Sequence, residues 1–324
     1  MRAIIYLPQD GAAREVPVRE ALEGRRNAGA LLWLDCGHLG EDDMALLSEE
    51  FGFHELALED AFKHHEQRPK VEEYDDHFFL VMHSLSARPQ GQSLTFERSE
   101  LDLFAGAGYV VTVHPGEVPE LETVWTDSLK RPSLMSNGSD RLTYHLLDRV
   151  VDNYLEAVDR IEDVIDYLED RAVDEKASEE GIREIFGFKR ELIRFRKTSG
   201  PLRDAIGELT SLDFPVVSAE TMPYLRDVYD HLIRLADMLD TYRDILGGAL
   251  DVHLAAVSNR LNEIMKRLTL VATVFMPLTF ITGFFGMNFL ELPFSSALWF
   301  WGSLVVMALT AFWMVDYFRR NHWL

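Results

Sequence analysis

Charged residues are almost absent from a long segment near the carboxyl end of this sequence. Between Leu268 and Phe318 there is no lysine or arginine, and the only acidic residues are Glu291 and Asp316. All 32 basic side chains of the 324-residue chain therefore lie outside this segment. A stretch of this length with so few charges is typical of a segment that lies in a lipid bilayer rather than in water.

Two parts of the segment are long enough to cross a bilayer, because a helical span needs about 20 apolar residues. We predict a first span over 268–290, an external loop over 291–296 and a second span over 297–318. Tryptophans stand near the proposed ends, as interfacial aromatic side chains do. A pair of buried core helices is the alternative, although core helices of soluble proteins seldom run this long without charge.

The basic residues on either side predict the orientation of the two spans. Lys266 and Arg267 precede the first span, whereas Arg319 and Arg320 follow the second. The positive-inside rule then places both termini and the basic tail 319–324 in the cytoplasm, with the loop outside. We expect an inner-membrane protein embedded in a lipid bilayer. Because two spans cannot enclose a pore, an ion path requires several copies around a symmetry axis.

Composition excludes several other classes of protein. The net charge of −22 argues against nucleic acid as a partner, because phosphate neutralisation needs basic patches. The single cysteine, Cys36, rules out a disulfide framework or a Cys-rich zinc module. No Walker-type phosphate loop is present, so we expect no nucleotide. No constellation of residues supports an enzyme.

Residues 1–140 are expected to form a cytoplasmic α/β domain. Short apolar or alternating runs predict strands, and the polar-flanked segments between them predict helices. The predicted strands are Ala3–Leu7, Leu31–Cys36, Phe78–Leu85, Leu94–Phe104 and Tyr109–Val113, and the predicted helices are Asp42–Glu50 and His54–Phe62.

Residues 141–267 are expected to form a cytoplasmic stalk of long, coiled-coil-like α-helices. The first is acidic, with apolar residues at alternating spacings of four and three from Leu147 to Ala172. A second is predicted over Glu179–Lys197. A third is predicted to begin near Thr221–Pro223 and to run to Phe285 in the first span. Such a helix would span roughly 90 Å and could carry a cytoplasmic movement into the membrane.

One face of this third helix has two possible roles. It carries residues at spacings of three or four, several of them small or weakly polar within the span. They are Met265, Leu268, Ala272, Met276, Thr279 and Gly283. Small residues permit close helix packing in lipid. Alternatively, the face lines a pore, with an apolar neck from Met265 to Met276 that closes by excluding water. Thr279 and Gly283 would then form a wetter outer part, with Asn288 at the mouth.

Gly286-Met287-Asn288, at the end of the first span, is the motif from which a family can be identified. It follows Phe-Met-Pro-Leu-Thr-Phe at 275–280, and Tyr-Phe-Arg-Arg-Asn-His-Trp-Leu closes the chain at 317–324. Further upstream, the segments 58–60, 67–72 and 224–231 match patterns of the same family. Over nearly its whole length, the sequence resembles the CorA family of magnesium and cobalt channels.

This resemblance implies a homopentameric funnel and Mg²⁺ uptake driven by the membrane potential, with Co²⁺ and Ni²⁺ as lesser substrates. It implies a selectivity filter of Gly286, Met287 and Asn288, in which a ring of Asn288 carboxamides holds hydrated Mg²⁺. Such a ring suits an ion that gives up its waters reluctantly.

The resemblance also implies gating by cytoplasmic Mg²⁺ bound between subunits. Asp227 matches the family acid on the long helix, and Asp148 and Asp152 match acids on the preceding one. The sequence departs from the family pattern between Asp76 and Glu97, where there is no acid to supply a partner from the N-terminal domain.

Two other functions remain open. The first is a zinc transporter of the same superfamily, with or without proton coupling, although Met287 favours magnesium. The second is a membrane-anchored sensor or scaffold without transport, which would leave Gly286–Asn288 without a purpose.

Overall fold

The computed structural model describes residues 1–63, 67–173, 179–211, 214–287, 297–321 and 323. The chain divides into two compact units, with the boundary between Leu250 and Asp251. This boundary falls inside one continuous helix, and each unit is described by itself below.

A mixed seven-stranded sheet organises the first unit, in the order β2-β1-β3-β7-β6-β5-β4. The strands are β1 (Arg2–Leu7), β2 (Ala12–Val16), β3 (Leu31–Cys36), β4 (Lys70–Glu73), β5 (His77–Gln90), β6 (Ser93–Gly106) and β7 (Tyr109–Val113). The central pair β3 and β7 is parallel, and the remaining neighbours are antiparallel. All six residues of β3 are buried, as expected for a strand covered on both faces.

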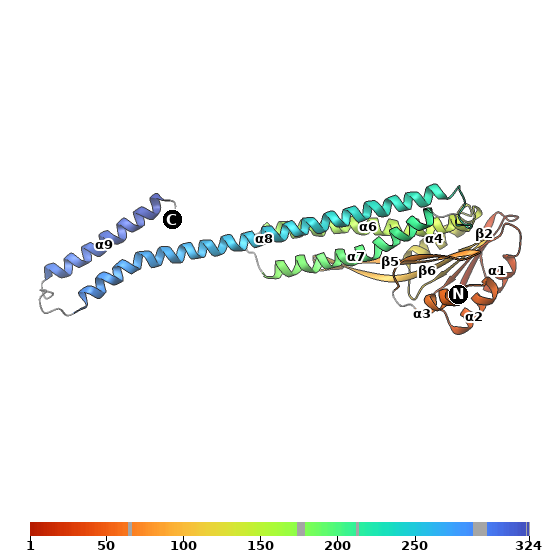
Figure 1. The fold of residues 1–324 in the computed structure, drawn as a ribbon, viewed down its shortest axis with the longest axis horizontal. Coiled ribbons are helices and arrows are strands. Elements are labelled where there is room, and N and C mark those ends of the chain that lie inside the picture. The colour runs from red at the N-terminus through yellow and green to blue at the C-terminus, as the bar shows by residue number, and fades with distance from the viewer. Residues whose placement is uncertain (64–66, 174–178, 212–213, 288–296, 322, 324) are drawn as a thin grey trace. The chain divides into compact units, whose positions relative to one another are not determined.

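Helices cover both faces of this sheet (Figure 1). On one face lie α1 (Val18–Gly24), α2 (Glu41–Phe51) and α3 (Glu55–Lys63), which share a core with alternate strand residues such as Leu32, Leu34 and Val111. On the other face lie α4 (Pro119–Lys130), α5 (Ser133–Ser136), α6 (Ser139–Val173) and α7 (Glu179–Ser211). Their core uses the intervening strand residues, including Trp33 and Leu103.

Most predicted strands are confirmed, and the differences have physical reasons. The bounds of β3 and β7 are those predicted. β5 continues to Gln90 rather than Leu85, because its last residues pair with β6 in a hairpin. These residues are mostly exposed, so they lack the run of apolar side chains from which the strand was predicted. Gly91 closes this hairpin with φ +65°, a conformation that favours glycine in a two-residue turn. The short strands β2 and β4 and helices α1, α4 and α5 were not predicted.

The long helices match the prediction in number and differ at one end. α7 continues beyond Lys197, passes through Pro201 without a break and ends at Ser211. α8 runs without interruption over Met222–Phe285, through Gly247 and Gly248 and through Pro277. At its start, the backbone N–H and the hydroxyl of Ser218 both donate to Asp140, at 2.9 and 2.6 Å. These bonds attach the loop before α8 to the first turn of α6.

The second unit contains the carboxyl-terminal part of α8 and the helix α9 (Ala297–Arg320). Both contain windows that are long and apolar enough to cross a membrane. Only 6% and 0% of the residues in these windows are buried.

Candidate functional site

The first candidate site lies in the first unit, where α6 and α8 bring predicted acids together. Asp148 on α6 is partly buried, and Tyr144 one turn earlier donates a hydrogen bond to its carboxyl group. Burial and the neighbouring charge of Asp152 raise the pKa of Asp148, and Asp227 on α8 raises it further. The structure therefore places two of the predicted regulatory carboxylates, Asp152 and Asp227, within electrostatic reach of the third, Asp148.

Helix packing fixes this arrangement. Arg141 on α6 stacks over the ring of Tyr224 on α8, with its guanidinium carbon 3.2 Å from the ring centroid. Tyr144 also packs against Tyr224. Asp227 follows Tyr224 by three residues, so this contact holds Asp227 near the acids of α6. His231, one turn further on, lies 4.0 Å from the Asp227 carboxylate.

Within one copy, this group of acids is not a complete metal site. The described residues contain no cluster of three histidine, cysteine, aspartate or glutamate side chains that could hold an ion. The side chain of Asp227 is 62% exposed, so it remains open to a further ligand. Like charges so close together are destabilising unless a cation or a partner neutralises them.

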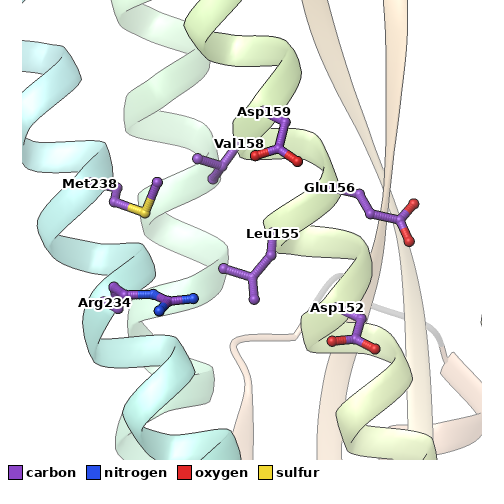
Figure 2. Close-up of a pocket in the computed structure, with 7 residues that line it drawn as sticks. All are labelled: Asp152, Leu155, Glu156, Val158, Asp159, Arg234 and Met238. Carbon is purple, nitrogen blue, oxygen red and sulfur yellow. The ribbon is translucent and has the colours of Figure 1, made fainter.

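A groove of about 510 Å³ continues the acidic region along α6 (Figure 2). The α6 lining consists of Asp152, Leu155, Glu156, Val158 and Asp159. Figure 2 shows Arg234 and Met238, on α8, pointing toward α6. Arg234 is the one basic residue of the lining, against three carboxylates. The groove is therefore acidic and open to solvent.

The structure also reveals a buried carboxylate that sequence patterns missed. Glu120 on α4 is 4% exposed, and the hydroxyl of Ser84 on β5 donates to its two carboxylate oxygens at 2.8 and 2.9 Å. The side-chain amide of Asn153, next to Asp152, donates to the same carboxylate and to the Leu85 carbonyl. An acid thus approaches the end of the predicted strand Phe78–Leu85 from a distant helix, where β5 itself supplies none.

The second candidate site lies on the apolar helices of the second unit. All six residues of the predicted pore face are exposed within the chain, with Met276 at 72%. Three of them border a groove of about 540 Å³ that also contacts Met314 of α9. This groove is lined by Leu268, Thr269, Ala272, Thr273, Met276, Pro277 and Met314. Among the described residues, none covers this face fully, so it is available to line a pore or to pack against another copy.

The Gly-Met-Asn motif begins where α8 ends. The backbone N–H groups of Gly286 and Met287 donate to carbonyls of the last turn, at 2.9 and 3.2 Å. A β-carbon at Gly286 would lie 3.2 Å from the Thr282 carbonyl, so glycine fits this tight turn best. The Met287 side chain is 54% exposed. Asn288 lies outside the described residues.

Comparisons with known proteins agree on one family. Residues 28–320 match the family described as CorA-like Mg²⁺ transporter protein. The "Cobalt/magnesium transport protein CorA" of Thermotoga maritima is 38% identical over 305 residues, which cover 92% of this chain and 85% of that protein. The "Zinc transport protein ZntB" of Klebsiella pneumoniae is 25% identical over 82% of this chain.

A solved structure shares the complete fold. "The complete structure of CorA magnesium transporter from Methanocaldococcus jannaschii" superimposes with a TM-score of 0.84 at 24% identity. The match covers 100% of this chain and 99% of that one. The α/β domain, the long helix and the two carboxyl-terminal apolar helices are all included, and these two helices are membrane spans. Both the family match and the 38% identity extend over most of the sequence, so the chain belongs to the family of CorA-like Mg²⁺ transporter proteins.

Proposed function

We propose that this protein is a channel for Mg²⁺ and Co²⁺ uptake, formed by several copies of the chain around one axis. The observation that carries the proposal is the uncovered face of α8, which leads to Gly286-Met287-Asn288 in a member of this family. A relative that is 38% identical is named a cobalt/magnesium transport protein. A pentamer is the number of copies that the family resemblance implies.

In this proposal, the carboxamides of Asn288 bind the water shell of the entering ion, with Met287 and Gly286 completing the filter. The apolar stretch from Met265 to Met276 forms the gate, and Thr279 and Gly283 line the wetter outer part. An inside-negative potential supplies about 4.6 kcal/mol per 100 mV to a divalent ion, twice the single-charge value. Uptake therefore needs no nucleotide. Both termini lie in the cytoplasm, as the flanking basic residues predict.

Regulation is proposed at the carboxylates of α6 and α8. Asp148, Asp152 and Asp227 supply the hard oxygen ligands that Mg²⁺ prefers. The raised pKa of Asp148 reflects burial first and then the negative charge of Asp152 and Asp227, and a cation would relieve this charge. Because one chain does not complete the site, a second copy would contribute the remaining ligands. Bound Mg²⁺ would then hold neighbouring copies together and favour the closed state.

Asn288→Ala should abolish Mg²⁺ flux, because the ring of carboxamides at the mouth would be lost. The test uses purified full-length protein in liposomes under an imposed inside-negative potential, with Mg²⁺, Co²⁺, Ni²⁺ and Zn²⁺ compared. Asn321→Ala, beyond the end of α9, is the matched control. Undiminished flux in Asn288→Ala would remove the filter assignment. Zinc movement that follows a pH gradient would favour the zinc-transporter alternative, and no flux of any ion would favour a scaffold.

Asp227→Ala should weaken the protection from protease that Mg²⁺ gives to the cytoplasmic part. Removing this carboxylate takes away a ligand that two copies would share. Limited proteolysis of the full-length protein over a Mg²⁺ titration measures the effect. Asp237→Ala provides a control at an exposed acid on the same helix. Equal protection in Asp227→Ala and the parent would contradict a regulatory role.

A further inference from the structure

A buried carboxyl group without a hydrogen-bond partner lies on the face of the sheet that α3 covers. Asp102 on β6 is 1% exposed, and neither of its carboxylate oxygens has a partner within the described residues. The residues beside it on this face are Val81 on β5, Val113 on β7 and Phe104 on β6, which all belong to the core that α3 shares. A buried carboxylate is costly unless it is paired. Asp102 therefore needs either a bound proton or a cation.

Lys70 on β4 is a cation that lies in the same row of the sheet as Asp102. Lys70 is opposite Val81, and Val81 is opposite Asp102, so the three residues share one face. The Lys70 amine lies 5.8 Å from the centre of the Phe79 ring, on this face. Two strand spacings amount to about 10 Å, which the flexible four-carbon stem of lysine and the aspartate side chain can bridge together. A change of side-chain rotamer is therefore enough to bring Lys70 to Asp102.

In the structure, the Lys70 amine is bound to other carboxylates. It donates to Asp60 on α3 at 2.8 Å and to Glu72 on β4 at 2.6 Å. The contact with Asp60 links the last turn of α3 to the sheet. The rest of this helix is held by buried apolar residues such as Leu58. Asp60 and Asp102 can thus compete for one cation.

The other titratable groups near Asp102 do not neutralise its charge. Burial raises the pKa of Asp102 well above its usual value, and the acids Glu100 on β6 and Asp60 on α3 raise it further, whereas Lys70 lowers it. His83 on β5, opposite Glu100, is 2% exposed, and burial lowers its pKa to about 4. His83 is therefore neutral near pH 7, and Lys70 is the cation that acts on Asp102.

We propose that Lys70 is a proton-controlled switch that fastens α3 to the sheet or releases it. While Asp102 holds a proton, Lys70 stays on Asp60 and the last turn of α3 is fastened. When the pH rises, Asp102 releases its proton to solvent, and the new carboxylate draws the Lys70 ammonium inward. The ion pair with Asp60 is then lost. The switch gives the α/β domain a response to pH that goes beyond the proposed function and does not depend on it.

The first test is hydrogen–deuterium exchange of full-length protein in detergent at pH 6 and pH 9, followed by mass spectrometry. The last turn of α3 should exchange about threefold faster at pH 9, after correction for the intrinsic pH dependence of exchange, because an ion pair of this exposure contributes little more. Asp102→Asn cannot ionise, so its α3 should exchange equally at both pH values. Glu97→Gln removes an exposed acid from the same strand and should keep the parental response.

The second test asks whether Lys70 is the group that moves. Lys70→Met should make the last turn of α3 exchange rapidly at both pH values, with circular dichroism establishing that the variant is folded. The proposal is overturned if the parent shows no difference between the two pH values, or if Lys70→Met keeps the parental response. It is also overturned if β5 accelerates as much as α3, since a buried charge would then loosen the whole domain. None of these measurements involves ion flux, so the proposed channel and this switch can fail separately.

Discussion

The two units of this molecule differ in where their apolar side chains lie: the first unit buries them and the second exposes them. In the first unit, residues such as Trp33, Phe104 and Leu232 are fully buried in cores on both faces of the sheet. In the second unit, Leu270 and Phe318 are the only buried apolar residues within the described part. Phe280 and Phe312 are 73% and 74% exposed.

This difference shows where each unit obtains its stability. Burial of apolar surface is the main favourable term in folding, and the first unit achieves it within its own chain. The second unit lacks an internal core, so its apolar surface must be covered by lipid and by other copies. In a bilayer, its backbone groups are satisfied within each helix.

The largest effect should come from separating the two units. A fragment ending at Leu250 should remain monodisperse in aqueous buffer without detergent, because its apolar residues are covered within the unit. The full-length protein should precipitate under the same conditions, owing to the exposed side chains of α8 and α9. Size-exclusion chromatography with light scattering compares the two. If the full-length chain stays soluble and single-copy in water, the assignment of two membrane spans is wrong.

The same substitution, phenylalanine to alanine, should have different effects on stability in the two units. Phe104→Ala, at a position with 0% exposure, should cost about 3–5 kcal/mol of unfolding free energy. Phe280→Ala, at 73% exposure, should leave the unfolding of the α/β domain unchanged. Urea denaturation, followed by tryptophan fluorescence, reports this difference for the full-length protein. Equal losses for both variants would mean that Phe280 contributes to the same core.

The smallest expected effect comes from a buried acid within the first unit. Asp102 on β6 is 1% exposed, and its carboxylate oxygens have no hydrogen-bond partner within the described residues. Burial raises the pKa of Asp102 well above its usual value, and Glu100 and Asp60 raise it further, against an opposing effect of Lys70. The folded state therefore holds a proton that the unfolded state releases, and stability falls as pH rises above the unfolded pKa near 4.

Asp102→Asn should accordingly raise the melting temperature of the fragment ending at Leu250, and more at pH 8 than at pH 4. Each kcal/mol recovered corresponds to roughly 2–4 °C. Thermal melts followed by circular dichroism across this pH range measure the change. Asp127→Asn, at a half-buried acid on α4, serves as the reference. A gain that is independent of pH would show that Asp102 is charged in the folded protein.

Local patterns were sufficient to predict the elements whose side chains repeat with a clear period. β3 and β7 are continuous buried runs, and α8 has a regular apolar seam, so their bounds follow from the sequence. The polar end of β5 and the short strand β2 carry no such signal, since cross-strand hydrogen bonds rather than apolar burial hold them. The order of the strands depends on pairings between residues far apart in the chain.

The candidate site shows the same limit. Asp148 and Asp227 could be named from motifs, and the structure places both at the contact between α6 and α8. Glu120 could not be named, because its partner Ser84 lies 36 residues away and no local pattern links them. The filter residue Asn288 lies outside the described residues, so its role stays a prediction from the motif.

The parallel pairing of β3 with β7 affects how the sheet can form while the chain is being synthesised on the ribosome. Its partners include Leu32 with Tyr109 and Cys36 with Val113, so the first three strands cannot take their place in the sheet until β7 has been synthesised. Closing so large a loop delays the pairing and exposes unpaired strand edges in the meantime. The spans are translated last. The incomplete sheet therefore has to be protected from aggregation at an early stage of synthesis. At that stage, the membrane spans of α8 and α9 have not yet left the ribosome.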